Sequence, residues 1–156
     1  MKIALIVSLL GVVVVMLLWG EEQGWFTRHE DPFKGKTVEA ILTTKGGGSG
    51  DLFVIDQTIT DRATVDWFCN QIKKGTVTKF EGFFGTLLPA QIFIDDKGEV
   101  ITAVYCRIPE YRVCFMDVVK TDRGYAFKSR ESESGIYDKE YVQRVARMSK
   151  VSIPSK

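Results

Sequence analysis

The chain has 156 residues, and its 21 lysines and arginines against 20 aspartates and glutamates give a formal net charge of +1 at pH 7. A chain this close to neutral has no electrostatic basis for binding nucleic acid or another polyanion. After the apolar amino terminus is set aside, about 120 residues remain, which suits one domain with a single core.

The amino terminus holds an uncharged apolar run over residues 3–19, preceded by Lys2. As a helix, about 17 residues extend about 25 Å, at the short end of the length that crosses a bilayer. Trp19, Trp25 and Phe26 then lie where aromatic rings favour the headgroup region. We expect residues 1–20 to be a single-pass transmembrane signal-anchor, with a cleaved secretory signal as the alternative.

Lysine and arginine counts on the two sides of this run are nearly balanced, so they give little information on orientation. An apolar run that begins at residue 3 is nevertheless what export machinery recognises as a signal. We therefore expect residues 21–36 to be a connector with a turn at Asp31-Pro32, and residues 37–156 to be an extracytoplasmic domain. In a bacterium this domain would face the periplasm.

The domain begins with two short β-prone runs, residues 37–44 and 51–56, on either side of the glycine-rich residues 45–50. This pattern predicts a hairpin with a loose tip. The glycines are not followed by a helix or by Gly-Lys-Ser/Thr, so a phosphate-binding loop is disfavoured.

A helix is expected next, capped by Thr60 or Asp61 and ending near Lys74, with Gly75 in the left-handed conformation. Four apolar residues at helical spacing predict one buried stripe; they are Val65, Phe68, Cys69 and Ile72. The only histidine, His29, belongs to the connector, so a catalytic Cys-His pair with Cys69 is not expected.

Residues 90–128 predict a four-stranded antiparallel meander, with turns at residues 95–98 and 121–124. If its middle turn is centred on Glu110, Cys106 lies opposite Cys114 and alternate residues share an apolar face. Opposed cysteines in such a pair come close enough for a disulfide, which would suit an exported domain. The alternative is two reduced core cysteines. Paired metal-ligand spacing is missing, so neither a metal nor another cofactor is expected.

A final helix is expected over residues 137–149, with an apolar face and a basic face. The apolar face holds Tyr141, Val142, Val145 and Met148, and the basic face holds Lys139, Arg144, Arg147 and Lys150. A basic face is usually solvated; the alternative is contact with anionic lipid headgroups.

The segment of residues 80–89 is neither a periodic helix nor a regular strand, because its apolar side chains alternate with glycines and precede a proline. Exposed phenylalanines in a loop would mark a partner or membrane contact. The favoured interpretation is that Phe83, Phe84, Leu87 and Leu88 fold back to close one end of the core, and the alternative is a partner-binding segment, which is where we would place a functional site. The candidate residues are Phe80, Phe83, Phe84, Leu87 and Leu88.

The predicted fold class is α+β, with a hairpin, a four-stranded meander and two helices packed on one face of the sheet. The favoured function is a membrane-anchored, non-enzymatic binding or accessory protein that acts on another envelope protein, with no small-molecule site identified. The alternative is a small tethered enzyme that uses carboxylates such as Asp95, Asp96 or Asp117.

Overall fold

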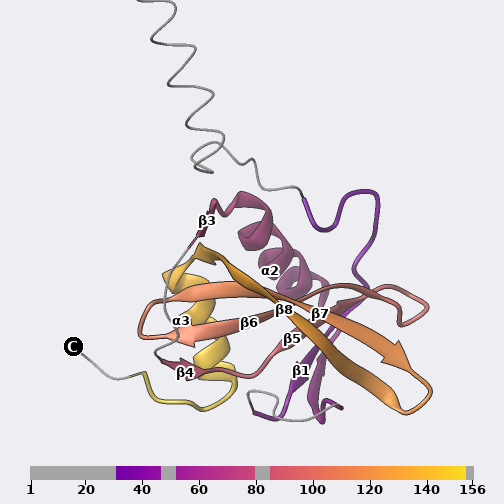
Figure 1. Cartoon of the computed structure of the whole chain (residues 1–156). Coiled ribbons are helices and arrows are strands. Elements are labelled where there is room, and N and C mark those ends of the chain that lie inside the picture. The colour runs from indigo at the N-terminus through magenta and orange to yellow at the C-terminus, as the bar shows by residue number, and fades with distance from the viewer. Residues whose placement is uncertain (1–30, 47–51, 80–84, 154–156) are drawn as a thin grey trace, which may run out of the picture.

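The structure is a computed structural model that describes residues 31–46, 52–79 and 85–153 (Figure 1). The transmembrane segment predicted at residues 1–20 and most of the predicted connector lie outside this range. Within the described ranges, no helix combines the length and the apolar character needed to cross a bilayer.

The described residues form one antiparallel sheet and two helices, which is the predicted α+β class. The sheet order is β2-β1-β5-β6-β7-β8-β3, and β4 pairs separately with β6. The sheet has eight strands where six were predicted. The two additional strands are β3, just before the irregular segment of residues 80–89, and β4, within it. In chain order the elements are β1 (Ala40–Thr44), β2 (Ile55–Ile59), α2 (Arg62–Lys74), β3 (Val77–Lys79), β4 (Thr86–Leu87), β5 (Gln91–Ile94), β6 (Val100–Ile108), β7 (Arg112–Thr121), β8 (Gly124–Tyr137) and α3 (Lys139–Met148).

Both faces of the central strands are apolar. On β5, Phe93 belongs to the core beneath the helices, while its neighbour Ile92 belongs to a second core on the opposite face. On β6, Val104 and Ala103 divide in the same way. Successive side chains of a strand point to opposite faces, so a strand with apolar residues at every position needs a cover on each side.

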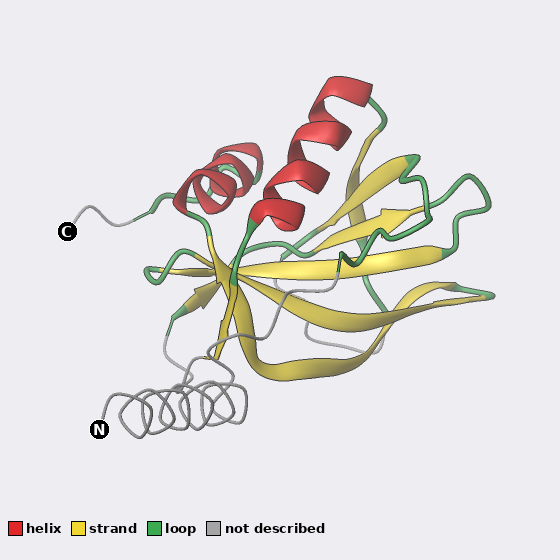
Figure 2. Cartoon of the chain, turned by 90° about the horizontal axis from the view of Figure 1, so that it is seen from above, coloured by secondary structure: helices red, strands yellow, loops and turns green. Residues whose placement is uncertain are grey.

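The two helices cover one face, and the sheet itself encloses the other. Figure 2 shows both helices on the same side of the strands. On the face away from the helices, the segment before β2 contacts β8. Leu52 forms an isolated bridge with Ala126, and the Phe53 amide donates a hydrogen bond to the Tyr125 carbonyl at 2.8 Å. This contact joins the first hairpin to the last strand and closes the second core.

The helix termini follow the sequence. The Asp61 carboxylate caps α2 by accepting from the Thr64 amide at 2.9 Å, and the Asp138 carboxylate caps α3 by accepting from the Tyr141 amide at 2.9 Å. The predicted stripe of α2 is confirmed, since all four of its residues are buried. On α3 the prediction is partly wrong, because the helix begins at Lys139 and Tyr137 still belongs to β8.

Gly75 ends α2 at the predicted position but in a different conformation. Its φ of −66° and ψ of 144° are extended and not left-handed. The reason for glycine is space, because a Cβ atom there would lie 2.2 Å from the Cγ2 atom of buried Ile136 on β8. Glycine therefore allows the end of α2 to pack directly against the sheet.

The meander has the predicted order and turns, but its central register differs by one residue. Arg107, and not Ile108, lies opposite Arg112, so Cys106 faces Val113 and Cys114 faces Tyr105. A shift of one residue moves every side chain to the opposite face. The first hairpin also differs, because its second strand is Ile55–Ile59 and not the predicted residues 51–56.

We predict that Gly75→Ala destabilises the domain by about 1–3 kcal/mol, since the added methyl group would overpack the contact with Ile136. Chemical denaturation measures the change in the free energy of unfolding. In an Ile136→Ala background, which lacks the clashing Cγ2 atom, Gly75→Ala should cost less than it does in the parent. A Gly75→Ala variant as stable as the parent would show that this contact is not tight, and Thr76→Ala at the exposed neighbouring position is the matched control.

Candidate functional site: an exposed tyrosine patch

The candidate partner-binding segment divides into two parts. Phe80, Phe83 and Phe84 lie outside the described residues. Leu88 is fully buried in the core beneath the helices, and Leu87 is partly buried against the second core. The two leucines therefore contribute to the cores, as the favoured interpretation of this segment expected for them.

The two ends of the segment are held against neighbouring parts of the sheet. On its amino-terminal side, β3 pairs with β8, with Val77 opposite Ile136. On its carboxyl-terminal side, β4 pairs with β6, with Thr86 opposite Ile108. Gly85 packs so closely on β6 that a Cβ atom would lie 2.4 Å from the Ile108 carbonyl oxygen. The described residues on either side of residues 80–84 therefore lie against the sheet, with Lys79 opposite Ser134 of β8 and Gly85 against Ile108 of β6.

An aromatic pair with flanking cations occupies this same region, and we name it the tyrosine patch: Tyr111, Arg112, Tyr137 and Lys139. The two tyrosine rings meet edge to face, with centroids 6.5 Å apart. The Arg112 guanidinium lies 5.9 Å from the Tyr137 ring centroid, and the Lys139 ammonium lies 5.5 Å from that of Tyr111. Cations at these distances are attracted to the ring faces.

Tyr137 remains 58% exposed although it ends a strand whose preceding residue, Ile136, is buried. Next to it lies a hollow of about 390 Å³, lined by the end of α2 and the start of α3. Tyrosine and arginine are enriched at protein interfaces, where they often supply much of the binding energy. The arrangement suits recognition of another protein's surface. Sequence patterns do not reveal this patch, because the β6–β7 turn and the β8–α3 junction are far apart in the chain.

The cysteines are free thiols, with Cys69 and Cys106 in the core beneath the helices and Cys114 in the second core. Cys106 points into the core beneath the helices and Cys114 into the second core, so the predicted disulfide between them is wrong. Burial raises the pKa of both thiols. On α2, burial raises the pKa of the Cys69 thiol to about 11. A thiol with so high a pKa is a poor nucleophile at neutral pH.

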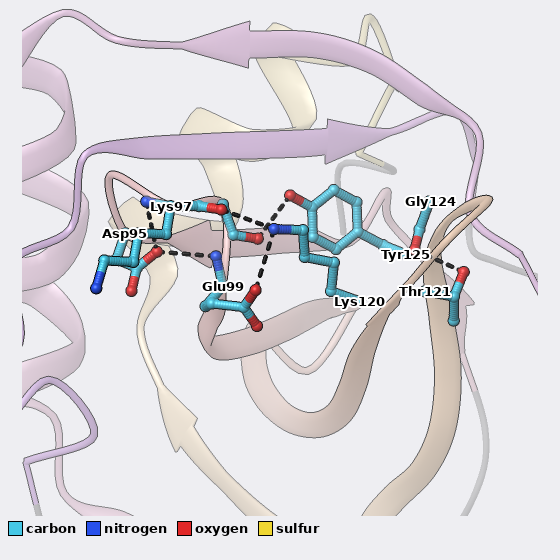
Figure 3. Close-up of polar contacts among 8 residues, drawn as sticks. Asp95, Lys97, Glu99, Lys120, Thr121, Gly124 and Tyr125 are labelled. Carbon is cyan, nitrogen blue, oxygen red and sulfur yellow. Dashed lines mark hydrogen bonds and ion pairs between the residues drawn. The ribbon is translucent and has the colours of Figure 1, made fainter.

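Two of the three carboxylates considered for catalysis, Asp95 and Asp117, take part in structural contacts. Asp95 accepts hydrogen bonds from the backbone amides of Lys97 and Glu99 at 2.9 and 2.8 Å, which shapes the β5–β6 turn (Figure 3). Lys120 then ties this turn to β7 by donating to the Lys97 carbonyl at 2.7 Å and pairing with Glu99 at 3.0 Å.

The Tyr125 hydroxyl adds a bond to the Gly98 carbonyl at 2.9 Å, so β8 is joined to the same turn. Farther along β7, Asp117 accepts from the Ser129 hydroxyl at 2.8 Å. Asp96 is exposed in the turn. Among the described residues, no group of three or more histidine, cysteine, aspartate or glutamate side chains is arranged to hold a metal ion.

No protein-family model matches the sequence, and comparisons with curated proteins and with solved structures give no match either.

We predict that all three cysteines of the full-length chain are alkylated when it is unfolded without reductant, because the sheet separates Cys106 from Cys114. In the native protein only Cys69 should react, and its rate should rise about tenfold per pH unit below its pKa of about 11, since the thiolate is the reactive form. Mass spectrometry of the labelled peptides measures both quantities. Cys69→Ser is the control, and a peptide joining Cys106 to Cys114 would contradict the observed register.

Proposed function

We propose that this chain is a membrane-anchored, non-enzymatic binding or accessory protein, tethered by residues 3–19, that recognises another envelope protein through the tyrosine patch and the adjoining segment of residues 80–84. The observation that carries the proposal is the exposed Tyr137, which packs against Tyr111 and the Arg112 guanidinium, while Lys139 lies over the Tyr111 ring. Aromatic rings bring a large contact area and lose little conformational entropy on binding.

The strand pairs on either side of residues 80–84 support the proposal. Both pairs adjoin the tyrosine patch. We therefore propose that the partner contacts both the tyrosine patch and residues 80–84.

The state of the reactive groups favours binding over catalysis. The Asp95 carboxylate is used by two backbone amides, and Asp117 is bonded to Ser129. A general base needs a carboxylate that is free to reach a substrate proton. The raised pKa of Cys69 disfavours a thiolate nucleophile as well.

Tethering adds to the proposal because it raises the local concentration of the domain near other membrane proteins. An interface of modest affinity then suffices for association. A small patch of two tyrosines and two cations is consistent with such an interface.

We predict that Tyr137→Ala weakens association with the envelope partner more than tenfold, because an exposed tyrosine at the centre of an interface contributes strongly to binding. The partner is identified by a photo-crosslinking residue placed at position 137 of the full-length chain in cells, and the affinity of the purified pair is then measured. Stability should change by less than about 0.5 kcal/mol, as is usual at exposed positions.

Phe127→Ala is the matched control, because Phe127 is another exposed aromatic residue, 37% accessible, near the opposite end of the same strand. Equal losses in the two variants would contradict a site at Tyr137. Phe83→Ser with Phe84→Ser tests the adjoining segment. If those rings are buried, each truncation should cost about 3–5 kcal/mol and the double variant should fail to fold.

We also predict that the full-length chain resists extraction by alkaline carbonate and keeps residues 1–20, because an apolar run of this length remains in the bilayer. A reporter fused after Lys156 should be active if it functions in the periplasm and silent if it functions in the cytoplasm. Mass analysis of the mature chain checks whether residues 1–20 are kept. A soluble form beginning near Glu21 would contradict the anchor.

A further inference from the structure

A groove runs between the helix α2 and the segment of residues 33–38 that leads into β1. It has a volume of about 350 Å³ and is separate from the tyrosine patch. Phe33, Val38 and Cys69 form its buried floor. One face of α2, from Arg62 to Lys73, forms a wall along its length.

The cations of this groove differ in how firmly they are held. The Arg62 guanidinium donates to the Val38 carbonyl at 2.8 Å and pairs with Asp66 at 2.6 Å, so it joins the two walls and neutralises the carboxylate. Lys73 makes a long contact of 3.9 Å with Asp31 and lies 5.7 Å from the Phe33 ring centroid. Lys36, on the opposite wall, is exposed.

Neutral hydrogen-bonding groups line the same groove as the lysines. Thr37 and Asn70 line the groove and are exposed. Two ammonium groups with a hydroxyl and an amide in one groove suit an anion that has several oxygens and a polar ester group. A phosphate diester has this chemistry.

The groove also lies where the chain arrives from the predicted anchor. About 11 residues separate Gly20 from Asp31, and a fully extended chain of that length reaches at most about 40 Å. Asp31 adjoins the groove through its contact with Lys73. If residues 3–19 cross the membrane, the groove is thus kept within reach of the headgroups.

We propose that this groove binds the phosphate diester of an anionic phospholipid headgroup, such as phosphatidylglycerol, and so sets how the tethered domain stands on the membrane. The inference rests on the proposed membrane attachment. Basic side chains close to a membrane surface gain favourable energy from anionic lipid. Orientation of the domain would in turn decide which way the tyrosine patch faces.

The test uses the full-length chain in a neutral detergent. Binding of short-chain phosphatidylglycerol and of short-chain phosphatidylcholine is measured by native mass spectrometry, and the alkylation rate of Cys69 on the groove floor reports occupancy of the site. Phosphatidylglycerol should bind at least about tenfold more tightly than phosphatidylcholine and should slow the labelling of Cys69. The double variant Lys36→Gln, Lys73→Gln should lose this preference while keeping the parent melting temperature.

The matched control removes the same charge elsewhere, with Lys45→Gln and Arg123→Gln at exposed positions in the turns after β1 and β7. It should bind phosphatidylglycerol like the parent. Equal binding of the two lipids, or equal losses in the two double variants, would overturn the proposal. Glycerol 3-phosphate that binds as tightly as the lipid would also overturn it, because the site would then serve a soluble phosphate ester.

The acidic connector is the competing occupant, and a variant with Glu21, Glu22 and Glu30 changed to Gln tests it. Faster labelling of Cys69 in that variant without lipid would mean that the connector covers the groove, and the lipid proposal would fail. Failure of membrane attachment is a distinct result, because carbonate extraction detects it whereas short-chain lipid binding does not depend on the anchor.

Discussion

Two apolar faces on the central strands are the constraint on which the rest of the fold depends. Val104 and Ala103 are adjacent residues of β6 and both are fully buried, on opposite sides of the sheet. Burying both faces requires a cover for each. The helices α2 and α3 cover one face, and the bridge from Leu52 to Ala126 closes the other.

The contact between the helices and the sheet also includes polar groups. Buried Tyr141 of α3 donates its hydroxyl hydrogen to the side chain of Gln91 on β5, with an oxygen–oxygen distance of 2.5 Å. Burial raises the pKa of this hydroxyl well above its usual value. Arg144 lies 4.3 Å from the ring centroid of Trp67 on α2 and so links the two helices. Part of the basic face of α3 therefore packs against α2 instead of facing only water.

Helix α2 carries residues of both surfaces proposed to be functional. Its residues from Arg62 to Lys73 line the groove, whereas Gln71, Lys74 and Gly75 border the hollow beside Tyr137. A rigid helix thus holds the two regions in a constant relation. On our proposals, the groove would meet the membrane and the tyrosine patch would remain available to a protein partner. In the tyrosine patch, Tyr111 has a positive φ of 53°, a backbone conformation that is uncommon for residues other than glycine.

The sequence by itself determined the features that depend on neighbouring residues. The cap at Asp61, the buried stripe of α2 and the turns of the meander all follow from local hydrogen bonds and helical or strand spacing. The tertiary structure alone decided the register between β6 and β7. Because both faces of these strands are apolar, a shift of one residue still buries apolar side chains, and alternation cannot distinguish the two pairings. The separation of Cys106 from Cys114, the extended conformation of Gly75 against Ile136 and the meeting of Tyr111 with Tyr137 likewise depend on packing between segments distant in the chain.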